Sequence, residues 1–131
     1  MSDGIRVSGI DHIVLNVSDV ERSVQFYTQV LGLAPVRVEQ WRKRQVPFPS
    51  VRVGPTTIID LLHVARSGEN MNHFCLVIEP TDFQALIESG RLDVVEGPAT
   101  RFGAQGDGQS LYVRDPDRNV VELRYYGPGP S

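Results

Sequence analysis

The feature that most constrains the fold of this chain is a pattern of one strand, one helix and three strands that occurs twice. Short apolar, β-branched runs between turn residues predict the strands, and apolar residues at steps of three and four predict the helices. In the first copy, these elements are expected at 10–17, 20–31, 35–38, 51–53 and 56–64. In the second copy, they are expected at 71–79, 83–87, 93–96, 110–113 and 120–126. Two copies favour two sheets that close on each other rather than a long array.

The two copies define two tandem βαβββ modules of an α+β protein. The chain has 131 residues, which is a typical length for one domain. We therefore expect a single domain over 1–131, with module one at about 8–66 and module two at about 69–126. Residues 127–131 alternate glycine and proline before a final serine and are expected to form a flexible tail.

Composition narrows the classes of partner. The formal net charge is −3, from 13 basic and 16 acidic residues, which argues against binding to nucleic acid or to an anionic membrane surface. No apolar run reaches the roughly 18 residues of a membrane span, and the start lacks the apolar core of a signal peptide. Cys75 is the only cysteine, so no intrachain disulfide forms. We expect a cytoplasmic protein with a small-molecule substrate.

Polar residues interrupt the apolar strands at equivalent places in the two modules. His73 follows His12 by 61 residues, and Glu122 follows Asp60 by 62 residues. A lone histidine of this kind is most often a hydrogen-bonded core residue. Two equivalent histidines and a glutamate are harder to explain in that way, because each buried polar group costs about 1–3 kcal/mol without a partner. A divalent metal would partner His12, His73 and Glu122 at once.

Two imidazoles and a carboxylate suit iron, manganese, nickel, zinc or cobalt, with positions left for water or substrate. One such ion per site is expected. Asp60 is a candidate fourth ligand, or alternatively a charge that pairs with an arginine across the sheet. Because alternate residues of a strand share a face, Arg124 and Tyr126 share the face of Glu122. They are the candidates for substrate contact or acid–base catalysis.

The segment 97–108 contains four glycines but lacks the Gly-Lys-Ser/Thr ending of a phosphate-binding loop. We expect a mobile hairpin or a lid over the active site, with Arg101 and Phe102 placed to cover a substrate.

Two motifs resemble the vicinal oxygen chelate superfamily. The opening Ile10-Asp11-His12-Ile13-Val14-Leu15 is similar to its first strand, and the segment Leu111–Leu123 is similar to its final strand pair. The superfamily includes glyoxalase I, extradiol dioxygenases, methylmalonyl-CoA epimerase, fosfomycin-resistance thiol transferases and metal-free bleomycin-binding proteins. The usual glycine after the Asp-Pro-Asp of the final turn is Arg118 here, so Asn119 is expected to take any positive φ.

The resemblance implies a half-open barrel of paired modules, and a homodimer. His12, His73 and Glu122 match the metal ligands of the superfamily, and Asp60 lies where glyoxalase I has a ligating glutamate. The implied function is glyoxalase-like lyase or isomerase chemistry on a small substrate chelated through adjacent oxygens. The alternatives are a single-domain extradiol-type dioxygenase, a drug-binding resistance protein without catalysis, and an inactive enzyme that kept its metal.

Overall fold

The computed structural model describes residues 4–30, 32–65, 67–68, 70–114 and 118–131. Its residues divide into two compact units. The N-unit is 12–72, and the C-unit combines 1–11 with 73–131. Strand β1 (Val7–Val17) therefore contributes its first half to the C-unit and its second half to the N-unit.

In the N-unit, four strands are hydrogen-bonded in the order β2-β3-β4-β1. Only the β1–β4 pair is parallel. Helix α1 starts where Asp19 caps it, because the Asp19 carboxylate accepts the Arg22 N–H at 3.1 Å. Val20 and Val24 then face Val38 and Leu61 in a small core. The remaining elements are α1 (Val20–Gln25), the π-helical η1 (Phe26–Val30), β2 (Ala34–Val36), α2 (Val38–Arg42), β3 (Ser50–Gly54) and β4 (Thr57–His63).

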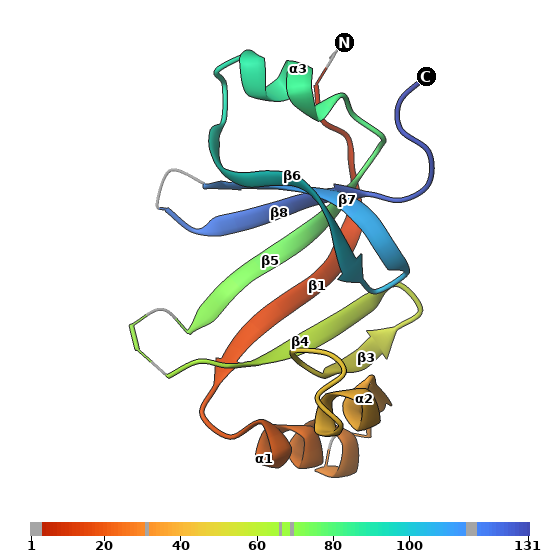
Figure 1. Ribbon diagram of the computed structural model, residues 1–131, viewed down its shortest axis with the longest axis vertical. Coiled ribbons are helices and arrows are strands. Elements are labelled where there is room, and N and C mark those ends of the chain that lie inside the picture. The colour runs from red at the N-terminus through yellow and green to blue at the C-terminus, as the bar shows by residue number, and fades with distance from the viewer. Residues whose placement is uncertain (1–3, 31, 66, 69, 115–117) are drawn as a thin grey trace. The chain divides into compact units, whose positions relative to one another are not determined.

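In the C-unit, the strand order is β1-β5-β8-β7-β6, and β5–β8 is a parallel pair. Asp82 caps α3 by accepting the Ala85 N–H at 3.1 Å, and Phe83 and Leu86 of this helix pack into a core with Ile78. The elements are β5 (Met71–Ile78), α3 (Phe83–Glu88), β6 (Asp93–Gly103), β7 (Gly106–Arg114) and β8 (Val120–Tyr125). Figure 1 shows α1 beside β4 in the N-unit and α3 beside β6 in the C-unit.

The repeated order of elements and the α+β class are confirmed. The first strand of each copy pairs in parallel with the last strand of the same copy, as β1 with β4 and β5 with β8. Among the described residues, no helix combines the length and hydropathy that a membrane crossing requires.

The strand expected at 35–38 is wrong in its second half. Strand β2 ends at Val36, Arg37 takes a left-handed φ of 59°, and Val38 starts helix α2. Burial of Val38 and packing of Trp41 against the N-unit core favour the helix over the β propensity of valine. The first helix ends with the π-helical segment η1, and Leu31 lies outside the described residues.

The lid expected at 97–108 is wrong, because this segment belongs to a paired β-hairpin. Strands β6 and β7 pair continuously from Ala99 opposite Ser110 to Gly103 opposite Gly106. Gly103 and Gly108 are required here by close packing, since a Cβ atom at either residue would overlap the guanidinium of Arg124.

The expected positive φ of Asn119 is also wrong. Arg118 itself takes the left-handed conformation, with φ 71°. The turn residues Asp115, Pro116 and Asp117 that precede it lie outside the described residues.

Candidate metal centre

The C-unit brings together one histidine and one carboxylate of the predicted ligand set. His73 lies on β5 and Glu122 on β8, and their Nε2 and Oε1 atoms are 3.1 Å apart. The Glu122 side chain is only 1% exposed. The parallel pairing of β5 with β8 positions the pair, because it places Cys75 opposite Glu122 with His73 two residues earlier on β5.

The two oxygens of Glu122 have different surroundings. Its Oε2 accepts a hydrogen bond from the Ser110 hydroxyl at 2.7 Å and another from Arg124 Nη1 at 3.2 Å. Its Oε1 is the atom that faces His73. The carboxylate is thus held in one orientation by β7 and by its own strand, with one oxygen directed at an imidazole.

The N-unit contains the equivalent pair. His12 on β1 and Asp60 on β4 are both buried, and His12 Nε2 lies 3.9 Å from Asp60 Oδ2. The other oxygen, Oδ1, accepts the hydroxyl of Ser50 from β3 at 2.5 Å. Each unit therefore holds a serine, a carboxylate and a histidine in the same chemical order.

Strand register shows that the two pairs are equivalent. Val14 stands opposite Asp60 in the N-unit, and Cys75 stands opposite Glu122 in the C-unit. In each case the histidine comes two residues before the residue that faces the carboxylate. Sequence reasoning missed Ser50 and Ser110, although their own separation of 60 residues repeats the spacing of the histidines and carboxylates.

Arg124 is completely buried in the C-unit and contacts the chain on all sides. Its Nη1 donates to the carbonyl of Phe102 at 3.2 Å, and its Nη2 donates to the carbonyl of Arg101 at 2.5 Å. Burial alone would lower the pKa of Arg124, but the charge of Glu122, followed by Tyr126 and Asp11, raises it above its ordinary value. The guanidinium therefore stays charged and links Glu122 to the β6–β7 hairpin.

Asp11 and Tyr126 form the other side of this buried network. Asp11 accepts the Ala104 N–H at 3.0 Å and the Tyr126 hydroxyl, and its Oδ2 is 3.9 Å from Arg124. The Tyr126 ring also stacks against the guanidinium, with its centroid 4.9 Å from Cζ. Burial first, and then the hydrogen bond to Asp11, raise the pKa of Tyr126, so its phenol keeps its proton.

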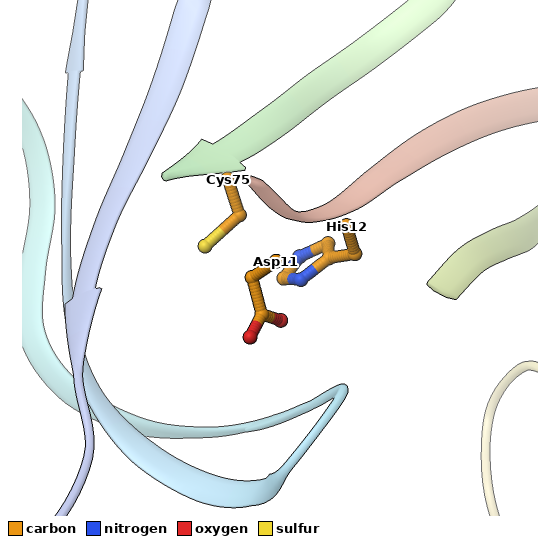
Figure 2. A group of neighbouring side chains, drawn as sticks. All are labelled: Asp11, His12 and Cys75. Carbon is orange, nitrogen blue, oxygen red and sulfur yellow. The ribbon is translucent and has the colours of Figure 1, made fainter. Parts of the chain in front are cut away.

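Asp11 and Cys75 also lie close together, with a carboxylate oxygen within 4.8 Å of the Cys75 sulfur. Figure 2 shows both side chains, together with His12, the residue that follows Asp11 on β1. Because the Asp11 carboxylate already accepts hydrogen bonds from the hairpin and from Tyr126, we assign it a structural role in the C-unit.

Tyr112 is a further residue that sequence reasoning missed. It stands opposite Glu122 in the β7–β8 register, and its ring meets the His73 ring edge-on with centroids 5.5 Å apart. Burial first, and then the negative charge of Glu122, raise the pKa of Tyr112. The signal was its alternation with Ser110, since both are polar residues on one strand.

The chemistry of these donors fits a divalent metal. Imidazole nitrogen and carboxylate oxygen are donors that iron, manganese, nickel, zinc and cobalt accept. Within each unit an imidazole nitrogen is directed at a carboxylate oxygen, and serine hydroxyls already bind the other carboxylate oxygen. Second partners of this kind are common around metal ligands. His63 lies exposed at the end of β4 and belongs to neither pair.

Comparison with known proteins gives a consistent family. The sequence model of the Glyoxalase/Bleomycin resistance protein/Dioxygenase superfamily matches residues 9–123. Virulence protein STM3117 of Salmonella typhimurium strain LT2 is 31% identical, with 92% of this chain and 85% of that protein covered. Lactoylglutathione lyase of Escherichia coli O157:H7 is 28% identical, with 86% of this chain and 88% of that protein covered.

A solved structure gives the same fold. The Mn(II)-bound glyoxalase from Novosphingobium aromaticivorans is similar with a TM-score of 0.68 and 19% identity, and 98% of this chain and 43% of that chain are covered.

Proposed function

The chain belongs to the Glyoxalase/Bleomycin resistance protein/Dioxygenase superfamily, and from this premise we propose that it is a metal-dependent lyase or isomerase of glyoxalase type. Its substrate would be a small molecule that presents two adjacent oxygens. The ligands of one divalent ion would be His12, His73, Glu122 and Asp60.

The observation that carries this proposal is the pair of equivalent histidine–carboxylate contacts. His73 and Glu122 are 3.1 Å apart in the C-unit, and His12 and Asp60 are 3.9 Å apart in the N-unit. Structural hydrogen bonds explain one such contact without difficulty, but they give no reason for the same contact at the same strand register in both modules. The similarity to a lactoylglutathione lyase supports the type of chemistry.

A bound divalent ion would supply Lewis acidity, which stabilises negative charge on substrate oxygens. The chain supplies positioned proton carriers. The Glu122 carboxylate is held by Ser110 and Arg124, so its orientation is set before substrate binds. Tyr112, which stands opposite Glu122, keeps its phenolic proton because its pKa is raised. It joins Tyr126 as a candidate donor to the substrate, whereas buried Arg124 acts by positioning Glu122.

The first test is elemental analysis of untagged protein purified without chelator. About one divalent ion per chain is expected, and it should be lost in both His12→Ala and Glu122→Ala. His63→Ala is the matched control, because His63 is the chain's third histidine and is exposed. The control should keep the metal. A wild-type chain that takes up no ion, even after divalent ions are added back, would contradict the proposal and favour a drug-binding protein.

The identity of the ion and two assays separate the remaining functions. Conversion of the substrate of lactoylglutathione lyase by the loaded protein would support the isomerase or lyase function. Oxygen uptake with a catechol, together with bound iron, would instead support the extradiol-type dioxygenase. A metal-loaded chain that is inactive in both assays would favour an enzyme that kept its ion and lost its activity.

A further inference from the structure

We propose that Ser110 and Ser50 are positioning residues which make each carboxylate of the metal centre bind through a single oxygen. Glu122 would bind the ion through Oε1 and Asp60 through Oδ2. This inference rests on the proposed function, because it specifies how the ligands of that site are presented.

The argument is strongest for Glu122. Ser110 Oγ and Arg124 Nη1 both donate to Oε2, at 2.7 and 3.2 Å. Two donors at one oxygen fix the rotation of the carboxylate and direct its second oxygen, Oε1, toward His73 Nε2 at 3.1 Å. An ion that replaced this contact would meet Oε1 first. Bidentate binding would require Oε2 to give up two hydrogen bonds inside a buried site.

The N-unit repeats the arrangement with different residues. Ser50 Oγ donates to Asp60 Oδ1 at 2.5 Å, and Asp60 Oδ2 is the oxygen nearer to His12 Nε2, at 3.9 Å. The carboxylate is one methylene shorter here, and the serine comes from β3 rather than from a strand equivalent to β7. The same division of the two oxygens therefore occurs in two separate surroundings.

The serines themselves have no other explanation as packing residues. Both are completely buried within strands. An alanine would fill nearly the same space without a hydroxyl, which costs free energy to bury unless it is hydrogen-bonded. For both serines, the hydrogen bond that the hydroxyl donates goes to a carboxylate of the proposed ligand set.

The test measures Mn²⁺ affinity by electron paramagnetic resonance of the free ion, with the full-length chain. Loss of a hydrogen bond to a metal ligand commonly weakens affinity by about 10–100-fold. Ser110→Ala and Ser50→Ala are each expected to raise the Kd for Mn²⁺ by about that factor. Ser110→Thr keeps a hydroxyl on Cβ and should restore most of the affinity.

The matched control is Ser89→Ala, which removes a serine hydroxyl that donates to the Leu86 carbonyl at the end of α3. It should leave the Kd unchanged. The melting temperature of each metal-free variant reports folding separately, so a purely structural role for Ser110 would lower that temperature without a specific effect on the Kd.

The outcomes separate the inference from the function. If wild-type chain binds Mn²⁺ and Ser110→Ala binds it with the same Kd, the positioning role is overturned and the metal-dependent function stands. If Ser110→Thr is as weak as Ser110→Ala while both stay folded, the hydroxyl is not the operative group and the inference also fails. If the wild-type chain binds no divalent ion, the function and the inference fail together.

Discussion

At the residue scale, the C-unit is unusual for a completely buried arginine. Arg124 has ion-pair partners in Glu122 and Asp11 and also donates to three backbone carbonyls of the β6–β7 hairpin. A buried charge is tolerated only when it is paired and hydrogen-bonded in this way. Removal of the guanidinium would leave two buried carboxylates without their common cation, so the consequence should appear in stability as well as in the metal centre.

We therefore predict that Arg124→Met lowers the free energy of unfolding by about 3–5 kcal/mol. Urea denaturation of the metal-free protein measures it. Arg101→Met is the control, because Arg101 forms an exposed ion pair with Glu96 at 2.6 Å, and such pairs are worth about 0–1 kcal/mol. Equal effects of the two substitutions would show that Arg124 contributes no more than a surface charge.

At the element scale, the β6–β7 hairpin is shaped around that arginine. Its tip lacks side chains at Gly103 and Gly108, where the guanidinium packs against the backbone. Its carbonyls at Arg101, Phe102 and Gly106 accept hydrogen bonds from Arg124. The glycines that resembled a mobile loop are therefore a packing requirement of a rigid element.

Gly103→Ala should consequently destabilise the protein by about 1–3 kcal/mol, the usual cost of overpacking a buried site. Gly9→Ala provides the comparison, since Gly9 is also a strand glycine of the C-unit and a Cβ there would meet nothing within 4 Å. Urea unfolding midpoints of both variants test this. An unchanged midpoint for Gly103→Ala would mean that the hairpin moves freely away from Arg124.

At the scale of the whole molecule, the assembly expected from the family resemblance is a homodimer. The N-unit exposes large apolar side chains on η1, where Phe26 is 47% and Val30 is 69% exposed. Exposed apolar groups of this size are consistent with association.

We predict that sedimentation equilibrium gives twice the chain mass at micromolar concentration, and that Val30→Asp shifts the equilibrium toward monomer if η1 is part of the interface. Val53→Asp, at an exposed residue of β3, is the matched substitution elsewhere in the N-unit. A single species of one chain mass at all concentrations would contradict the prediction of a dimer.

Much of the fold was predictable because it depends on local pattern. The period of apolar residues and the capping residues Asp19 and Asp82 locate helices and strands, and the repeat relates the two modules. The errors occurred where tertiary contacts outweighed local preference. Val38 joined a helix through burial, and the glycines of 97–108 formed paired strands around a distant arginine.

The sequence by itself determined the α+β class, the duplicated order of elements and the equivalence of His12 with His73 and of Asp60 with Glu122, because these follow from spacing along the chain. Only the tertiary structure decided which atoms meet within each unit. That Ser110 and Arg124 bind one oxygen of Glu122 while His73 faces the other depends on strands β5, β7 and β8 lying side by side. The physical reason is that hydrogen bonds of side chains depend on distances across a sheet, and spacing along one strand carries no record of them.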